Sequence, residues 1–400
     1  MSKKLIIVCL VNFLIAALLG LTLRFSYVQD IGINYRFLTH AHSHVAMLGW
    51  VYLMLYTLFV HYFTKHNKSF YNKLFWVTEI AVIGMLLSFP FQGYAPISIT
   101  FSTLHIFCSY FFAYRIWKDL YIKNHLIAFM VKTALTFMLL STIGIWCLGP
   151  AVGLMGKASA FYQIAIQFFL HFQFNGWFLM GVLAILFHQL KIEPSKITNR
   201  LVTVIIIATI LTLALPVQWF TGLTMLYFLN ATGIILQIWA LILFLKAIKN
   251  PYRVILANES STVKWMYYFA LSCFILKLVL QGITLFPGFS ETLINHTNFI
   301  IGFIHLTMLG TISGFLLAFI LKAKDLETNK ITSLGVYLFL IGFVLTEFLL
   351  TLQGSYFYFQ IGFIKNYYLI IFSASIFLPL GITFIIYSFF KNKNACLLNH

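Results

Sequence analysis

Three histidines occur in the same short spacing pattern in distant parts of the sequence. Each of His44, His171 and His305 is followed by a glycine five positions later. A neutral imidazole binds iron or copper without burying a net charge, which suits a site of low dielectric. A glycine about one turn further along a helix lets a flat macrocycle or a neighbouring helix approach the backbone. The pattern therefore favours a haem or metal site built on helices, with plain helix packing as the alternative.

The composition places those helices in a membrane. Hydrophobic residues make up 61% of the 400-residue chain and charged residues only 9%, against about a quarter charged in a soluble domain. These proportions exclude soluble enzymes, nucleic-acid-binding proteins and disordered scaffolds. The five cysteines show no CxxC spacing, so disulfides and zinc ribbons are not expected. The CxxCH motif of covalently attached haem is also absent.

Apolar segments long enough to cross a bilayer occur twelve times. A spanning helix needs about 20 apolar residues, because unpaired backbone groups are not tolerated in lipid. The sequence therefore predicts an all-α integral membrane protein with a single transmembrane helical domain over residues 1–400. The predicted spans lie near residues 4–24, 38–64, 74–91, 97–116, 126–149, 160–190, 200–219, 222–247, 264–285, 295–321, 331–354 and 366–390.

The basic residues predict the orientation of these spans. With the N-terminus inside, 20 of the 26 Lys and Arg residues fall in inner segments and four in outer segments. That bias places both termini in the cytoplasm. It accounts for the net charge of +17 without a nucleic-acid partner, and the basic inner face is expected to attract anionic membrane lipids. We expect a multi-pass protein of a bacterial-type inner (plasma) membrane.

The three histidines divide the twelve transmembrane helices into three pseudo-repeated sets of four. They lie 127 and 134 residues apart, in the second, sixth and tenth spans, which all run from outside to inside. Each histidine is about 9 to 15 Å from the outer end of its helix, at 1.5 Å per residue. Ionisable side chains at membrane depth are candidates for function. We therefore expect the three imidazoles to meet at one level and bind an iron or copper centre.

Further histidines flank these positions. His40 and His44 lie four residues apart on one helical face, whereas His42 points about 160° away. At least one of the three is expected to bind metal or haem. His105, in the fourth span, lies at a similar depth and is a candidate metal ligand or neighbour of a ligand.

Charged residues in or near the spans form a second group of candidates. Arg24 and Arg36, near the outer surface, are expected to pair with haem propionates through charge-assisted hydrogen bonds, or to act only as interface anchors. His40 is a further candidate for a propionate contact. Lys277 in the ninth span and Glu347 in the eleventh are costly in lipid unless they are paired or face water. They are therefore candidates for proton or anion passage.

The arrangement resembles subunit I of the haem-copper oxygen and nitric oxide reductases. The shared features are the three arcs of four spans, the histidines in spans two, six and ten, and the string His-Val-Ala-Met-Leu-Gly-Trp from His44, which is similar to that family's tenth-helix signature. The resemblance implies that His44 and His305 are axial ligands of a low-spin haem and that His171 binds copper. It also implies a non-covalent haem, b-type or other, respiratory electron transfer, a cytochrome c or quinol donor, and further respiratory subunits.

Two departures from that family concern its oxygen-reducing centre. Phe303 stands where the family's tenth helix has a second histidine. Residues 201–222 contain no histidine, where the family's seventh helix supplies an adjacent pair for copper. The low-spin haem site is therefore expected without the usual ligands of the copper centre, and an oxidoreductase activity stays open. His171, His105 and His42 are the imidazoles available for a second haem or a copper ion.

Two other interpretations remain. The string Thr39-His40-Ala41-His42 is similar to the early histidine motif of the NnrS membrane haem proteins, which are tied to nitric oxide stress, and residues 302–314 are similar to their later glycine-rich span. Alternatively, the chain is a transition-metal transporter in which His44, His171 and His305 form a three-histidine site for copper, zinc or iron.

Overall fold

The computed structural model describes residues 2–286, 288, 295–322 and 329–391. The chain is grouped into two compact units. Unit 1 comprises Met1–Asp119, Ser260–Ala270 and His296–His400, and unit 2 comprises Leu120–Glu259 and Leu271–Asn295.

The twelve predicted spans are confirmed as helices or runs of consecutive helices that are long and apolar enough to cross a membrane. No β-strand occurs within the described ranges. The spans are Lys3–Phe25, Tyr35–Phe63, Lys68–Gln92, Pro96–Asp119, His125–Met155, Ala160–Gln189, Lys196–Thr221, Met225–Val254, Ser261–Ile283, Thr297–Lys322, Lys330–Tyr358 and Tyr367–Lys391.

Local chemistry explains where several of these helices begin and end. The Asn34 side chain accepts a hydrogen bond from the Phe37 backbone N–H at 3.1 Å and so caps the second span. Asn124 caps the fifth span in the same way. The first N–H groups of a helix have no partner inside it, so short polar residues are favoured there. The fifth span runs to Met155, beyond the predicted residue 149, because Pro150 is accommodated inside the helix.

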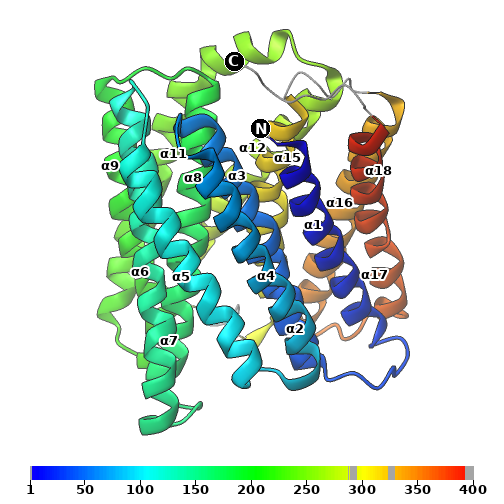
Figure 1. Ribbon diagram of the computed structural model, residues 1–400. Helices are drawn as coiled ribbons and strands as arrows, with labels where there is room; N and C mark the ends of the chain where they lie inside the picture. The colour runs from blue at the N-terminus through cyan, green and yellow to red at the C-terminus, as the bar shows by residue number, and fades with distance from the viewer. Residues whose placement is uncertain (1, 287, 289–294, 323–328, 392–400) are drawn as a thin grey trace. The chain divides into compact units, whose positions relative to one another are not determined.

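Unit 1 is built from the first four spans and the last three, together with the beginning of α12. Figure 1 shows α1 beside α17 and α18 in this unit. Its elements are α1 (Lys3–Phe25), α2 (Tyr35–His44), η1 (Val45–Tyr52), α3 (Leu53–Phe63), α4 (Lys68–Gln92), α5 (Pro96–Asp119), α14 (Thr297–His305), η3 (Leu306–Ser313), α15 (Gly314–Lys322), α16 (Lys330–Tyr358), α17 (Tyr367–Ser375), α18 (Phe377–Lys391) and the first residues of α12 (Ser261–Ile283).

Unit 2 contains the fifth to eighth spans and the rest of α12. Within it α6 packs along α7, and α9 packs along α11. The seventh span is interrupted between α9 and α10, three residues before Pro216. Its elements are α6 (His125–Met155), α7 (Ala160–His171), η2 (Phe172–Phe178), α8 (Leu179–Gln189), α9 (Lys196–Leu211), α10 (Ala214–Thr221), α11 (Met225–Ala257) and α12 from Leu271.

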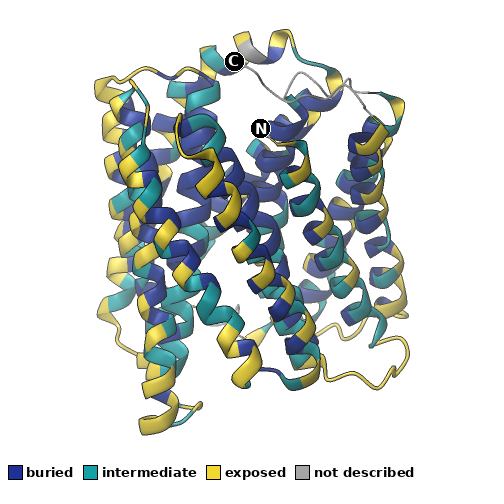
Figure 2. Cartoon of the chain, in the orientation of Figure 1, coloured by how far each residue is buried: buried dark blue, intermediate teal, exposed yellow. Residues whose placement is uncertain are grey.

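Burial singles out the three spans that carry the repeated histidine pattern. In the second and sixth spans 72% of the most apolar window is buried, and in the tenth span 78%, against at most 56% in any other span. Figure 2 shows the same contrast within unit 1, where α3 is dark blue while α4 and α5 expose one face. The histidine-bearing spans are therefore the most enclosed helices.

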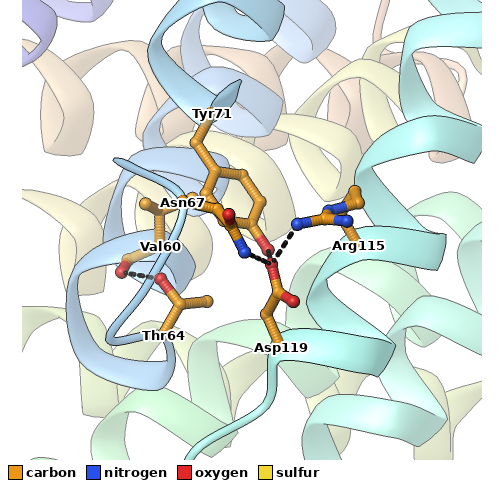
Figure 3. Close-up of polar contacts among 6 residues, drawn as sticks. All are labelled: Val60, Thr64, Asn67, Tyr71, Arg115 and Asp119. Atoms are coloured by element: carbon orange, nitrogen blue, oxygen red, sulfur yellow. Dashed lines mark hydrogen bonds and ion pairs between the residues drawn. The ribbon is translucent and has the colours of Figure 1, made fainter. Parts of the chain in front are cut away.

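A polar cluster joins the ends of three helices of unit 1 (Figure 3). The Asp119 carboxylate at the end of α5 accepts hydrogen bonds from Asn67 Nδ2 at 2.9 Å and Tyr71 Oη at 3.1 Å. It also pairs with Arg115 Nη2 at 3.0 Å. Nearby, the Thr64 hydroxyl at the end of α3 donates to its own helix at the carbonyl of Val60. Asp119 thus holds the α3–α4 connection against the end of α5.

Candidate functional site

Each of the three repeated histidines ends an α-helix and is followed at once by a π-helical segment. His44 precedes η1, His171 precedes η2 and His305 precedes η3. The histidines are the tenth, twelfth and ninth residues of their spans. Well under 1% of residues in globular proteins are in π-helices, and such turns are frequent at functional sites. The repeated sequence pattern therefore corresponds to a repeated local structure.

Two of the pattern's glycines allow close helix packing. A Cβ on Gly49 would lie 2.9 Å from Val82 Cγ1 and 3.1 Å from Asn12 Cβ. A Cβ on Gly176 would lie 2.6 Å from Phe137 Cβ. The distances of 2.9 Å and 2.6 Å are shorter than real Cβ contacts, so a side chain at either position would require its neighbour to move. Of the two roles that the sequence pattern allowed for these glycines, approach of a neighbouring helix is the one observed.

The π-helical segments of spans two and ten touch each other in unit 1. Trp50 Nε1, in η1, donates a hydrogen bond to Ser313 Oγ, in η3, at 2.8 Å. Trp50 is 1% exposed, and its ring stacks on Phe13 of α1 with centroids 4.5 Å apart. Two of the three histidine-bearing strings therefore meet through their π-helical segments. The string of His171 belongs to unit 2.

His40 and His44 share one face of α2, as the four-residue spacing predicts. Both rings contact Phe89 and Tyr94, with centroids between 4.4 and 6.0 Å apart. His44 Nδ1 donates to the carbonyl of His40 at 2.8 Å, and its Nε2 lies 3.5 Å from Tyr94 Oη. This pair of imidazoles faces α4 and the turn after it.

His42 faces the opposite side, towards α1 and His305. Its Nδ1 donates to the carbonyl of Ala16 at 2.8 Å, and a Cβ on Gly20 would lie only 3.0 Å from its Cε1. His42 and His305 lie within electrostatic range of each other. His305 Nδ1 in turn lies 3.5 Å from Glu347 Oε1. The Nδ1 atom of His42 is thus hydrogen-bonded, whereas the Nδ1 atom of His305 faces a carboxylate oxygen that has no hydrogen-bond partner.

Arg24 lies beside this pair. Its Nη1 donates a hydrogen bond to Ser375 Oγ, and its charge interacts with Glu347 and Tyr367. It also lies within electrostatic range of His42. Arg36, the other arginine considered for a propionate contact, is exposed. We call His42, His305, Arg24 and Glu347 the His42–His305 cluster.

His105 lies on a different side of α2 from this cluster. It is 4% exposed, and its Nε2 is buried without a hydrogen-bond partner. Its ring lies edge-on to Tyr52 with centroids 4.6 Å apart, and it is within electrostatic range of His44. His105 therefore adds an imidazole to the His40–His44 face rather than to the His42–His305 cluster.

In unit 2, His171 is held in a different way. Its Nε2 donates to the backbone carbonyl of Thr209 at 2.7 Å. Since a carbonyl only accepts, this nitrogen carries the hydrogen, and only Nδ1 has a lone pair for a metal. His171 therefore differs from His42, in which Nδ1 is the nitrogen that donates to a backbone carbonyl.

A small cavity of about 30 Å³ in unit 2 is lined mostly by apolar side chains and includes Thr209, the hydrogen-bond partner of His171. Its lining includes Thr209, Asn175, Gln237 and Lys277. Lys277 is 1% exposed and donates to Gln281 Oε1 at 2.7 Å. Asn175 Oδ1 and Gln237 Oε1 are buried without a hydrogen-bond partner. A water molecule needs about 10 to 15 Å³, so the space suits one or two waters around a buried ammonium group.

No group of three or more His, Cys, Asp or Glu side chains that would hold a metal ion occurs within the described part of the chain. None of the cysteines described there forms a disulfide, and Cys396 lies outside the described residues. The described cysteines are Cys9, Cys108, Cys147 and Cys273.

The pairing of His42 with His305 was not anticipated from the sequence. The helical geometry that separates His42 from His40 and His44 was visible there, but which face meets α14 depends on helix packing. No protein-family profile and no curated protein sequence matches this chain.

Proposed function

We propose that this protein binds haem in unit 1, with His42 and His305 as the two axial ligands. The observation that carries the proposal is the His42–His305 cluster. His42 Nδ1 donates to the Ala16 carbonyl, which leaves its Nε2 lone pair for iron, and His305 Nδ1 lies 3.5 Å from Glu347 Oε1. Histidines that bind metals almost always place their other ring nitrogen against a carbonyl or carboxylate in this way.

The surroundings of the two histidines also fit a haem. Glu347 Oε1 is a buried acceptor without a hydrogen bond, and Gly20 leaves the space that the His42 ring occupies. Arg24 supplies a guanidinium next to the pair, the group best suited to the planar carboxylates of haem propionates. The His305 side chain keeps 27% of its surface exposed, which leaves room for a flat ligand at the ring.

A bis-histidyl haem, when bound, supplies a one-electron Fe(III)/Fe(II) couple. The role of His42 and His305 is to hold it from two different helices, α2 and α14. Arg24 neutralises negative carboxylates in a span that otherwise tolerates charge poorly. We therefore assign the protein to membrane electron transfer through a non-covalent, b-type or related, haem.

The proposal keeps the general features implied by the resemblance to subunit I of the haem-copper reductases. It includes three sets of four helices, both termini in the cytoplasm, a bacterial-type inner membrane, and a cytochrome c or quinol donor. The NnrS-like interpretation shares the haem and is compatible with the same ligands. A copper centre is not part of the proposal.

Reduced-minus-oxidised absorption spectra of the purified protein, expressed with haem precursor, test the proposal. The wild-type chain is expected to show low-spin haem bands. His42→Ala and His305→Ala are expected to lose them, whereas His44→Ala, two residues along the same helix, is expected to retain them. A wild-type protein without haem bands refutes haem binding. Loss of the bands in His44→Ala with retention in His42→Ala refutes the ligand assignment.

A further inference from the structure

A carboxyl group is placed against the back of one of the two candidate haem ligands. Glu347 projects from α16 towards α14, where its Oε1 lies 3.5 Å from His305 Nδ1. Its side chain is only 17% exposed, and Oε1 has no hydrogen-bond partner although it is buried. The imidazole of His305 is therefore positioned to donate a hydrogen to this oxygen.

The neighbouring turn of α14 is shaped to admit this carboxyl group. Gly302, three residues before His305, is buried. A Cβ at Gly302 would lie 3.3 Å from Glu347 Oε2, which is tighter than ordinary van der Waals contact. The glycine therefore leaves the space in which the second oxygen of Glu347 sits. Two independent features, the Nδ1 contact and the missing Cβ, place the carboxyl group at His305.

We propose that Glu347 is a positioning residue for His305 that sets the tautomer of the imidazole and lowers the reduction potential of the bound haem. This inference rests on the proposed function. A carboxylate on Nδ1–H leaves the Nε2 lone pair free and makes the ring a stronger donor. Stronger donation and a nearby negative charge both stabilise the ferric state, which carries one more positive charge than the ferrous state.

The asymmetry of the two ligands follows from the same contacts. His42 Nδ1 meets a neutral backbone carbonyl, that of Ala16, whereas His305 Nδ1 meets a carboxyl group. The His305 side therefore has a carboxyl group next to the ring, and a single substitution can replace it while the shape of the side chain is kept. Arg24, whose charge also interacts with Glu347, lies on the same side and limits the cost of that charge.

Redox titration of the purified, haem-loaded protein, followed by its visible absorption, tests this role. Glu347→Gln removes the charge at constant size and is expected to raise the midpoint potential with the haem spectrum retained. Glu347→Asp is expected to restore part of the wild-type value. Glu79→Gln is the matched control, because Glu79 is a buried carboxyl in α4 that is bonded to Asn12 rather than to a histidine.

The outcomes separate this inference from the proposed function. A rise in Glu347→Gln that exceeds the change in Glu79→Gln supports it. A shift no larger than that of the control, or a fall in potential, overturns it while haem binding stands. Wild-type protein without haem overturns the proposed function as well. If Glu347→Gln does not fold, Gly302→Ala replaces it: displacement of the carboxyl group by the new Cβ is expected to raise the potential, and an unchanged potential overturns the inference.

Discussion

Substitution of Gly176 by alanine tests the tight packing of the π-helical segment in unit 2. The new Cβ would lie 2.6 Å from Phe137 Cβ and 2.7 Å from its Cγ, well short of the 3.4 Å at which ordinary contact begins. Rotation about the side-chain bonds of Phe137 does not move its Cβ, so α6 or η2 itself must shift. Phe137 is 4% exposed and stacks on Phe172, which leaves little room. Overpacking of this kind costs about 1 to 3 kcal/mol.

The measurement is the free energy of unfolding in mixed micelles with increasing denaturing detergent. Gly153→Ala is the matched control, because Gly153 lies in α6 and a Cβ there would have no atom within 4 Å. Both variants change the helix propensity in the same direction, so their difference isolates the packing cost. We expect Gly176→Ala to be less stable than Gly153→Ala by about 1 to 3 kcal/mol. Equal stabilities would refute the close contact between η2 and α6.

Two further predictions concern stability. Ser313→Ala removes the acceptor of the buried Trp50 Nε1 and is expected to destabilise the protein by about 1 to 3 kcal/mol. Its control, Ser355→Ala, removes an exposed hydroxyl bonded only within its own helix and is expected to change stability by less than about 0.5 kcal/mol. A similar loss of stability in both variants would contradict the role of the Trp50 hydrogen bond. Asp119→Ala breaks three contacts at once. It is expected to lower thermal stability more than Arg115→Ala, which breaks only the i,i+4 pair, worth about 0.3 to 0.5 kcal/mol. The reverse order would contradict the arrangement in Figure 3.

The sequence was sufficient for the membrane-spanning helices because their signal is local. Each span needs about 20 apolar residues in a helix to cross the lipid. Length and hydropathy therefore identify a span without knowledge of the helices around it. The ends were less well predicted. Pro150 lies inside α6 rather than at its end, because a membrane helix tolerates proline where surrounding groups satisfy the freed carbonyl.

The candidate site was predicted only in part, because its contacts depend on helix packing. Helical geometry correctly separated His42 from the His40–His44 face, but it does not tell which face of α2 meets α14. The contact of Glu347 with His305 joins residues 42 positions apart on two helices. In the sequence near His305, the only residue that reflects this contact is Gly302. A glycine at that position does not identify which side chain fills the space. The π-helical turns after the histidines also give no simple hydropathy signal.

The charges of unit 1 support one another in a way that an isolated intramembrane charge does not permit. Arg24 and Glu347 interact electrostatically, and both lie in membrane-spanning helices. Each of the two charged groups also has a polar neighbour in direct contact: Glu347 lies against His305, and Arg24 donates to Ser375. The cluster is therefore a connected polar site enclosed by apolar helices, and its two imidazoles are the part of it that remains available to a ligand.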